Sequence, residues 1–314
     1  MKKTTGYNIF RLLRPRQWIK NLALFAAITF GGQLFDINAL YLTFLGFIVF
    51  CMLSSAIYVV NDIFDREKDR LHPFKRFRPI AHGDISIKQA LVTVVLLTIP
   101  SFIIGFFVSP TFFVCIIVYL ILQLSYSVWL KHIAGADILA IAAGYILRVY
   151  GGEFASGSHI SVWLLLTTIS ISLFLAVGKR RSELTLVSRR SDAKINATRK
   201  SLSHYSEKLL DVYLSIFATS TFISYALFTF LENPVGVKLS LGILMPEFLP
   251  DFLQRKWLMI TILPVVYGLM RYLEDIYEKH EGESPEKVLL GDKPLLITVT
   301  IWVILVILVT YVIA

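Results

Sequence analysis

Three aspartates and an asparagine cluster where a long apolar stretch of the chain ends. Asn61, Asp62, Asp65 and Asp69 lie within the string Asn61-Asp-Ile-Phe-Asp-Arg-Glu-Lys-Asp69. On a continuous helix, Asp62, Asp65 and Asp69 share one face, and Asn61 borders it. Carboxylates so close together repel one another, and a divalent cation would neutralise them. Mg²⁺ fits this role because it prefers hard oxygen ligands and completes its coordination shell with substrate phosphates. The string therefore predicts a magnesium site. The alternative is a solvated helix end whose acids pair with the basic residues between them.

Basic residues follow these acids at once. Lys75, Arg76 and Arg78 lie in the string His72-Pro-Phe-Lys-Arg-Phe-Arg-Pro79, whose two prolines end the helix and leave an extended loop. The three cations can therefore reach back toward the carboxylates. Cations beside a magnesium site fit a substrate with several phosphates, which arginine holds through forked hydrogen bonds. The alternative is a basic patch that is attracted to lipid head groups.

A second polar string, Gly178-Lys-Arg-Arg-Ser-Glu183, follows the sixth apolar run of the chain. Lys179 and Glu183 are i, i+4 neighbours, so one side of a helix end presents a cation and an acid together. With Arg180 and Arg181 beside them, these residues form a candidate phosphate site. The alternative is that the basic residues only anchor the end of a membrane span.

Three further polar residues lie in or beside the fourth and fifth apolar runs, namely Tyr126, Lys131 and Arg148. An arginine inside a membrane span costs about 2.5–3.5 kcal/mol on insertion scales unless it faces a polar partner. We therefore expect Arg148 to point into the interior of a helix bundle. The alternative role for Arg148 is a structural ion pair with another helix.

Long apolar runs must position all of these residues. The chain has 314 residues, of which 56% are hydrophobic and 17% charged, and its mean hydropathy is +0.67, which excludes a soluble globular domain. The run from Leu295 to Ala314 has twenty residues without a charge and is long enough to cross a membrane. We predict an all-α, polytopic membrane bundle of nine transmembrane helices. The nine predicted spans are Trp18–Phe35, Ala39–Val60, Ala90–Val108, Thr111–Lys131, Ala136–Gly152, Ile160–Val177, Val212–Leu231, Trp257–Leu273 and Leu295–Ala314.

The basic residues also predict how the bundle is oriented. With nine spans, 27 of the 31 Lys and Arg residues fall on one side of the membrane and three on the other. The positive-inside rule then places the N-terminus in the cytoplasm and the C-terminus outside the cell membrane. We predict a single integral-membrane domain over residues 1–314, with an amphipathic cytoplasmic lead-in at 1–20 and cytoplasmic active-site loops at 61–89 and 178–211.

Taken together, these strings resemble the UbiA superfamily of intramembrane prenyltransferases. The spacing Asn61-x3-Asp65-x3-Asp69 is similar to the first aspartate-rich motif of that superfamily, which implies its helical membrane fold. Longer strings, spread over nearly the whole chain, resemble the decaprenyl-phosphate phosphoribosyltransferase branch of the superfamily. These strings are Arg14-Pro-Arg-Gln-Trp-Ile-Lys-Asn21, Asn61-Asp-Ile-Phe-Asp-Arg-Glu-Lys-Asp69, His72-Pro-Phe-Lys-Arg-Phe-Arg-Pro-Ile80, Tyr126-x3-Leu-Lys131, Leu147-Arg148 and Gly178-Lys-Arg-Arg-Ser-Glu183.

The resemblance implies a magnesium-dependent reaction that moves a phosphoribosyl group from phosphoribosyl diphosphate (PRPP) to a polyprenyl phosphate of the decaprenyl type, in cell wall biosynthesis. Asn61, Asp65 and Asp69 would hold Mg²⁺ on the departing diphosphate, with Asp62 as a further ligand or support. The implied partners are these two substrates and the lipid bilayer, without a nucleic acid; a homo-oligomer is left open. The implied substrate-binding residues are Lys20, Lys75, Arg76, Arg78, Tyr126, Lys131, Arg148, Lys179, Arg180, Arg181 and Glu183.

One departure from the superfamily separates two enzymatic interpretations. Ring prenyltransferases of the superfamily carry a second aspartate-rich motif near the inner end of the sixth span, where this chain has Lys179-Arg-Arg-Ser-Glu183. Basic residues there suit two phosphate-bearing substrates better than a prenyl diphosphate and a neutral ring. A prenyltransferase that acts on an aromatic or glyceryl-phosphate acceptor is the second interpretation. A membrane transporter is the third, and it requires the acids to lie near the middle of the membrane.

Overall fold

The computed structural model describes residues 5–71, 75–189, 200–232, 257–279 and 285–313. Every regular element in these ranges is helical, so the predicted all-α class is confirmed. The longer helices are α3 (Ile37–Phe64), α6 (Ile87–Val108), α7 (Pro110–Val128), α8 (Ala136–Ser156), α9 (Val162–Arg189), α10 (Glu207–Leu231), α12 (Ile262–Glu274) and α14 (Lys293–Leu308). The shorter ones are α1 (Thr5–Leu13), η1 (Pro15–Phe25), α2 (Ala26–Phe30), α4 (Arg66–Leu71), η2 (Lys75–Phe77), α5 (Pro79–His82), η3 (Leu130–His132), η4 (Lys200–His204), η6 (Trp257–Thr261), η7 (Asp275–Lys279), α13 (Pro285–Gly291) and η8 (Val309–Ile313).

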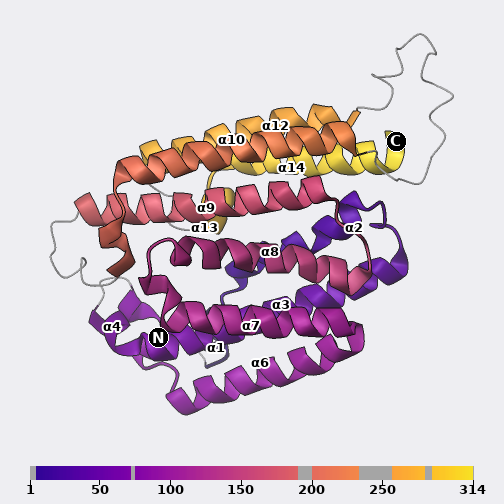
Figure 1. Ribbon diagram of the computed structural model, residues 1–314. Helices are drawn as coiled ribbons and strands as arrows, with labels where there is room; N and C mark the ends of the chain where they lie inside the picture. Colours follow the sequence, from indigo (N-terminus) through magenta and orange to yellow (C-terminus); the bar gives the residue numbers. More distant parts are fainter. Residues whose placement is uncertain (1–4, 72–74, 190–199, 233–256, 280–284, 314) are drawn as a thin grey trace, which may run out of the picture.

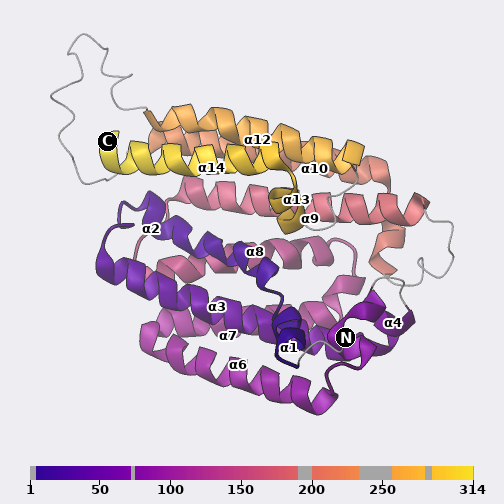
Figure 2. The same cartoon turned by 180° about the vertical axis from the view of Figure 1, so that it is seen from behind.

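The long helices lie side by side along a common direction (Figure 1). Helices α6, α7 and α3 form one side of the bundle, α8 and α9 its middle, and α10, α12 and α14 the other side. In the view of Figure 2, η1 and α2 lie in front of α8, with α4 at one end of the bundle and α2 at the opposite end. The end of the chain lies beside α2, because the Tyr311 hydroxyl donates to the carbonyl oxygens of Ile28 at 2.8 Å and Thr29 at 2.9 Å.

Among the residues that the structure describes, eight helices are long and apolar enough to cross a membrane. They correspond to the second to ninth predicted spans. The first predicted span, Trp18–Phe35, is wrong as an α-helix, because the chain there forms the 3-10 helix η1 and then the short α2. A 3-10 helix rises about 2.0 Å per residue, so η1 and α2 together still extend roughly 30 Å. The number of crossings is therefore approximate, and the bundle is that of a multi-pass membrane protein.

Backbone contact with α8 explains the tight course of η1. A Cβ atom on Gly152 of α8 would lie 1.8 Å from the carbonyl oxygen of Leu24 in η1. No side chain fits between two backbones that approach so closely, and small residues permit such approaches between membrane helices. Glycine at position 152 therefore lets η1 pack against the middle of the bundle, where it carries Lys20 and Asn21 to the interior.

We expect Gly152→Ala to lower the free energy of unfolding by about 3 kcal/mol, because the added methyl group must push η1 away from α8. Denaturant unfolding of the purified protein, followed by tryptophan fluorescence, measures this loss. The matched control is Gly268→Ala in α12, where the nearest atom to the new Cβ is 3.9 Å away, an ordinary contact. Equal stability of the two variants would contradict the close packing of η1.

Two helices extend farther than the apolar runs predict. Helix α3 continues through Asp62, and α9 continues to Arg189 although the predicted span ended at Val177. The predicted active-site loop at 178–211 is therefore wrong in its first part, which is helical. In this extension of α9, the fully buried Arg180 has acidic partners that compensate its charge.

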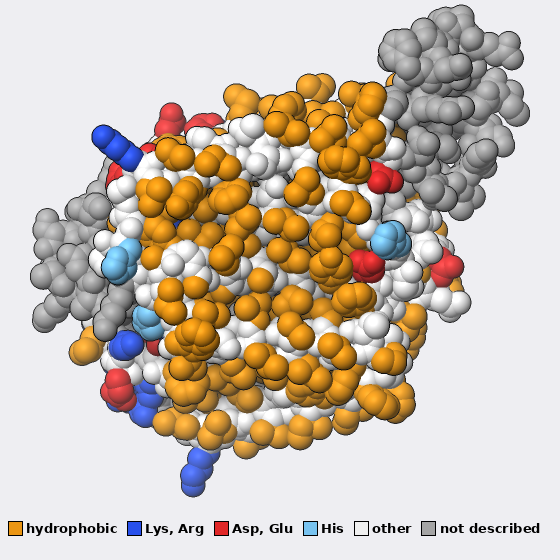
Figure 3. Space-filling model, viewed as in Figure 1, with side chains coloured by type: hydrophobic (Ala, Val, Ile, Leu, Met, Phe, Trp, Pro, Cys, Tyr) orange, Lys and Arg blue, Asp and Glu red, His pale blue; other side chains and the backbone are white. Residues whose placement is uncertain are grey.

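Apolar side chains cover the flank of the bundle. Figure 3 shows a broad hydrophobic band across the face that is seen in Figure 1, with Lys and Arg side chains at the left edge of the band. On α6 the exposed fraction reaches 66% for Leu96 and 80% for Phe107, a surface that lipid tails cover favourably. The three basic residues predicted to face outward, Lys238, Arg255 and Lys256, lie outside the described residues, so the orientation of the termini stays a prediction.

One short helix, α13, inserts into the bundle within a stretch that the sequence indicated as a loop. It packs against η1 and α14, and Figures 1 and 2 place it beside α9. Val288 is 1% exposed and joins a core cluster with Phe174 and Tyr272. Glu286, on the first turn of α13, is only 4% exposed. The insertion thus brings an acid from near the C-terminus into the interior.

Candidate active site

Two buried acids, Asp62 and Asp69, meet at the end of α3. Asp62 lies on the last turn of α3 and is 2% exposed, and Asp69 lies in α4 and is 4% exposed. Arg78, just before α5, contacts both acids: its Nη1 lies 3.1 Å from Asp62 Oδ1 and 2.7 Å from Asp69 Oδ2. Arg14 also donates to Asp62. The structure therefore brings two of the three predicted carboxylates to one positive group.

Asp65 points elsewhere because the predicted continuous helix is wrong. The backbone of Asp65 (φ −89°, ψ 4°) interrupts the helix between α3 and α4. Its Oδ1 lies 3.4 Å from Nζ of Lys131 in η3. Asn61 is half-buried on α3, one residue before Asp62. Among the described residues, no group of three Asp, Glu, His or Cys side chains is arranged to hold a metal ion by itself.

The alternative of a solvated helix end applies only to Glu67 within this string. Its side chain is 75% exposed and contacts Arg66 and Arg70, its neighbours in α4. The partners of the three aspartates come from outside the string. One of them, Arg14, has a left-handed backbone (φ 54°), which is uncommon for a residue with a side chain and is typical of functional sites.

The other two predicted loop cations lie in η2, before Arg78. Lys75 is half-buried, and Arg76 is exposed with its guanidinium carbon 4.9 Å from the ring centre of the adjacent Phe77. Of these three predicted phosphate holders, Arg78 contacts the acids Asp62 and Asp69.

Arg148 points into the bundle, as predicted, and is 6% exposed. Its Nε donates to Asn21 Oδ1 at 2.8 Å and its Nη2 donates to the Tyr119 hydroxyl at 2.8 Å. Its Nη1 donates to the carbonyl oxygen of Gly144. These partners are neutral oxygens, so these contacts do not form the ion pair with another helix that was the alternative role of Arg148. Arg148 instead places a positive charge half-way along α8.

A third polar group surrounds Lys20, which is one of the predicted phosphate holders. Lys20 Nζ lies 3.0 Å from Glu286 Oε2 and donates to Gln17 Oε1 at 2.6 Å. The Gln17 amide donates to Glu286, and the Tyr58 hydroxyl donates to Gln17 Oε1 at 3.2 Å. We call Gln17, Lys20, Tyr58 and Glu286 the interior polar group.

The predicted phosphate site on α9 is divided between two networks. Arg180 is fully buried; its Nε lies 2.7 Å from Asp137 Oδ2, its Nη2 donates to the Tyr126 hydroxyl at 2.9 Å, and its Nη1 contacts Glu183. Because Asp137 lies in the first turn of α8 and Tyr126 lies in α7, Arg180 ties three helices together. Lys179, the next residue toward the N-terminus, is half-buried.

Arg181 faces a different set of acids. Its Nε lies 2.7 Å from Asp211 Oδ1 and its Nη2 lies 3.1 Å from Glu207 Oε2, both on α10. The guanidinium carbon is 5.4 Å from the ring centre of Tyr277 in η7. Arg180 and Arg181 are thus directed to opposite partners, and the structure does not gather them at the acids on α3 and α4. Their role as phosphate holders stays a prediction.

The sequence profile of the UbiA prenyltransferase family matches residues 22–248, well over half of the chain. The chain belongs to this family. It is 34% identical to the decaprenyl-phosphate phosphoribosyltransferase of Mycolicibacterium smegmatis over 94% of this chain and 90% of the relative. The relative of the same name from Corynebacterium glutamicum is 34% identical over 99% of this chain and 89% of its own length.

Solved UbiA structures share the fold. The UbiA homolog from Archaeoglobus fulgidus bound to GPP and Mg²⁺ superimposes with a TM-score of 0.69 and 18% identity, covering 96% of this chain and 99% of the homolog. Because the identity is low, the likeness concerns the arrangement of helices. The predicted UbiA-like membrane bundle is confirmed.

The acid pair offers the donor set that Mg²⁺ requires. The Arg78 nitrogen already stands as a positive group between Asp62 and Asp69, at hydrogen-bonding distance from both. Mg²⁺ in proteins is commonly held by one or two carboxylates and completes its shell with substrate phosphates and water. Asn61 precedes Asp62 in α3 and carries a further hard oxygen, whereas Asp65 contacts Lys131 in this structure. The residues present therefore fit the metal that the solved UbiA homolog holds.

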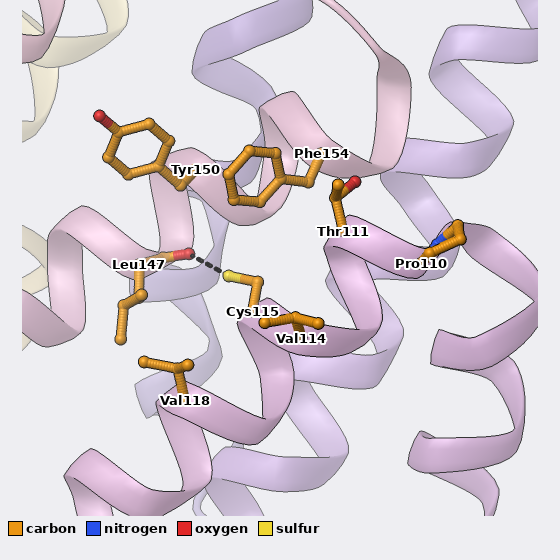
Figure 4. A pocket seen from close by; sticks show the side chains of 8 residues that line it. All are labelled: Pro110, Thr111, Val114, Cys115, Val118, Leu147, Tyr150 and Phe154. Carbon is orange, nitrogen blue, oxygen red and sulfur yellow. Dashed lines mark hydrogen bonds between the residues drawn. The ribbon is translucent and has the colours of Figure 1, made fainter.

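An apolar groove of about 430 Å³ lies between α7 and α8 (Figure 4). The Cys115 thiol on its wall donates to the Leu147 carbonyl oxygen at 3.4 Å, and the rings of Tyr150 and Phe154 stack with centroids 5.5 Å apart. The groove extends from the middle of α8 toward the end of the bundle that is opposite to the acids. Its lining residues are Pro110, Thr111, Val114, Cys115, Val118, Leu147, Tyr150 and Phe154.

The sequence did not indicate three residues that contact predicted site residues or one another: Arg14, Gln17 and Glu286. Arg14 and Gln17 lie in the string Arg14-Pro-Arg-Gln-Trp-Ile-Lys-Asn21, so the family-like string held a signal for both. Glu286 has no such signal, because its burial depends on where α13 inserts.

Proposed function

We propose that this chain transfers the 5-phosphoribosyl group of PRPP to a polyprenyl phosphate of the decaprenyl type and releases diphosphate. The observation that carries the proposal is the similarity to two decaprenyl-phosphate phosphoribosyltransferases over at least 94% of the chain. The site supports it, because the buried acid pair is surrounded by cations that suit phosphate-bearing substrates.

The acid pair acts on the leaving diphosphate. Asp62 and Asp69, with Asn61 and Asp65 beside them, would hold Mg²⁺, which supplies the positive charge that stabilises diphosphate as it departs. Arg14 and Arg78 add forked donors at the same place. The bond between ribose C1 and the diphosphate oxygen breaks, and an oxygen of the acceptor phosphate forms the new bond to C1.

The acceptor needs no strong general base. A phosphate monoester carries about −1.5 to −2 charges at pH 7, so its oxygen is already a nucleophile. The protein therefore acts mainly by aligning the two substrates and neutralising their charges. Lys131, which contacts Asp65, and Arg148, which lies in the interior of the bundle, are the candidates to hold the acceptor phosphate. In-line attack inverts the configuration at C1.

The polyprenyl tail of the acceptor requires an apolar path. We assign part of this tail to the groove between α7 and α8, because its lining is apolar and includes Leu147, the residue before Arg148 in α8 (Figure 4). The charged substrate reaches the opposite, basic end of the bundle, which we place in the cytoplasm. An enzyme with an apolar groove for the tail and a basic end for the sugar phosphate can join a soluble substrate to a membrane lipid.

The test uses purified protein in membranes that contain Mg²⁺, decaprenyl phosphate and an aromatic or glyceryl-phosphate acceptor, with either labelled PRPP or labelled prenyl diphosphate. We expect label from PRPP to enter the lipid fraction and label from prenyl diphosphate to remain in its own form. Incorporation from prenyl diphosphate alone, into an aromatic or glyceryl-phosphate acceptor, would establish the second interpretation. The transporter interpretation is not favoured, because Asp62 and Asp69 lie at the end of α3 and in α4 rather than near mid-membrane.

A further inference from the structure

The interior polar group combines a buried carboxylate with donors and acceptors from two other elements. Glu286 comes from α13, Gln17 and Lys20 from η1, and Tyr58 from α3. The side chain of Glu286 is 3% exposed and that of Lys20 is 17% exposed. A short helix from the C-terminal part of the chain must enter the bundle for these contacts to form. Such a costly arrangement points to a role in recognising a ligand.

The chemistry of this group does not suit a phosphate alone. Phosphate oxygens accept hydrogen bonds and are repelled by a carboxylate. Glu286 and the Gln17 carbonyl oxygen are also acceptors, so they cannot donate hydrogen bonds to a phosphate. Burial disfavours the charged form of Glu286, but the Lys20 ammonium and the hydrogen bonds to the carboxylate outweigh it and lower the pKa of Glu286. Glu286 is therefore a carboxylate at neutral pH. Carboxylate, amide, hydroxyl and ammonium groups side by side match the hydroxyl groups of a sugar, each of which donates one hydrogen bond and accepts others.

The interior polar group adjoins the acid pair. Tyr58 lies one helical turn before Asp62 on α3, a rise of about 6 Å. Arg14 joins the two places, since it contacts Asp62 and its guanidinium carbon lies 4.9 Å from the ring centre of Tyr58. A pentose whose diphosphate lies at Asp62 and Asp69 would therefore extend its ring toward Gln17 and Glu286.

Resting on the proposed function, we propose that Glu286 and Gln17 accept hydrogen bonds from the ribose 2- and 3-hydroxyl groups of PRPP. On binding, the sugar hydroxyls replace the contacts that Gln17 and Glu286 make with each other in this structure. Lys20 stays beside Glu286 and balances its charge. A prenyl group has no hydroxyls to offer, so the same residues select a sugar donor against a prenyl donor.

The decisive measurement compares PRPP with its 2-deoxy analogue. Sites that hydrogen-bond a substrate hydroxyl reject the analogue that lacks it by large factors, up to about 10⁴-fold, and we expect the wild-type protein to prefer PRPP in kcat/KM by at least about 10²-fold. In Glu286→Gln, kcat/KM for PRPP should fall by about 10- to 100-fold while that for the analogue changes little, because a hydrogen bond to a charged group is lost only with PRPP. A merely structural role would lower both values by the same factor, and that result would overturn the inference.

Two further variants keep the test sound. Glu286→Asp retains the negative charge beside Lys20, so that the protein folds. Its shorter side chain moves the carboxylate away from the ribose hydroxyl groups, so this variant should also show a reduced preference for PRPP. Glu274→Gln in α12 is the matched control, because Glu274 contacts Arg271 at 2.6 Å and takes no part in the interior polar group. We expect the preference for PRPP to be unchanged in this control.

A binding measurement that requires no transfer reaction tests the inference separately from the proposed function. Ribose 5-phosphate and 2-deoxyribose 5-phosphate are titrated into the protein in detergent. We expect ribose 5-phosphate to bind at least about tenfold more tightly to the wild type, and this difference to vanish in Glu286→Gln. If that pattern appears but no label moves to lipid, the hydroxyl site holds and the proposed transfer is overturned. If label moves but the two sugars bind equally well, the inference about Glu286 is overturned and the proposed function holds.

Discussion

We expect Asp69→Ala to lower phosphoribosyl transfer by about 10³-fold or more, because it removes one of the two buried carboxylates that converge on a positive group at the end of α3. Without this acid the site would hold Mg²⁺ less firmly, and the negative charge of the departing diphosphate would be less well neutralised. Asp65→Ala should cause a loss of similar size if Asp65 turns from Lys131 to the metal when substrate binds. Transfer of label from PRPP to lipid, in membranes with matched protein content, measures both effects.

The control for this prediction comes from the same string of residues. Glu67 lies between Asp65 and Asp69, but its side chain is 75% exposed and pairs with arginines in α4. Exposed pairs of this kind contribute little, so Glu67→Ala should keep activity within about twofold of the wild type. All three variants should insert into membranes equally well. Full activity of Asp69→Ala would remove the acid pair from the reaction, whatever the similarity to UbiA proteins.

The long membrane helices could be predicted because their signal is local. Uninterrupted apolar runs of about twenty residues can satisfy their backbone in lipid only as helices, so the second to ninth spans were found with shifted ends. The type of helix in η1 could not be predicted in this way. It depends on the approach of the Leu24 backbone to Gly152, which is 128 positions later in the chain. Likewise, α13 is too short for an apolar run to indicate it.

The site was predicted in composition but not in its pairing. The string Asn61–Asp69 identified the acids, because polar residues at the end of an apolar span are costly unless they have a function. The break at Asp65 has no glycine or proline to announce it, and it sends Asp65 to Lys131 while Asp62 and Asp69 share Arg78. The partner of Lys20, Glu286, is separated from it by most of the chain and became visible only in three dimensions.

Arg180→Met should lower the free energy of unfolding by about 3–5 kcal/mol, because it leaves the fully buried Asp137 without its cation. Both side chains are 0% exposed, so water cannot replace the lost partner. Thermal unfolding in detergent and the yield of folded protein report the loss. The neighbouring Lys179→Met is the control, since Lys179 is half-buried and has no comparable network with the residues that the structure describes; the stability of this variant should remain near that of the wild type.

A double variant decides whether the role of Arg180 is structural. In Arg180→Met with Asp137→Leu, both charges are gone, and much of the lost stability should return, because apolar replacement of a whole buried ion pair is often neutral. Glu183, the second acidic partner of Arg180, still limits the recovery to a part. If Arg180→Met instead folds like the wild type and raises KM for PRPP, Arg180 holds a substrate phosphate, as its position in the string Gly178–Glu183 predicted. Recovery of folding in the double variant would place Arg180 among the residues that hold α7, α8 and α9 together.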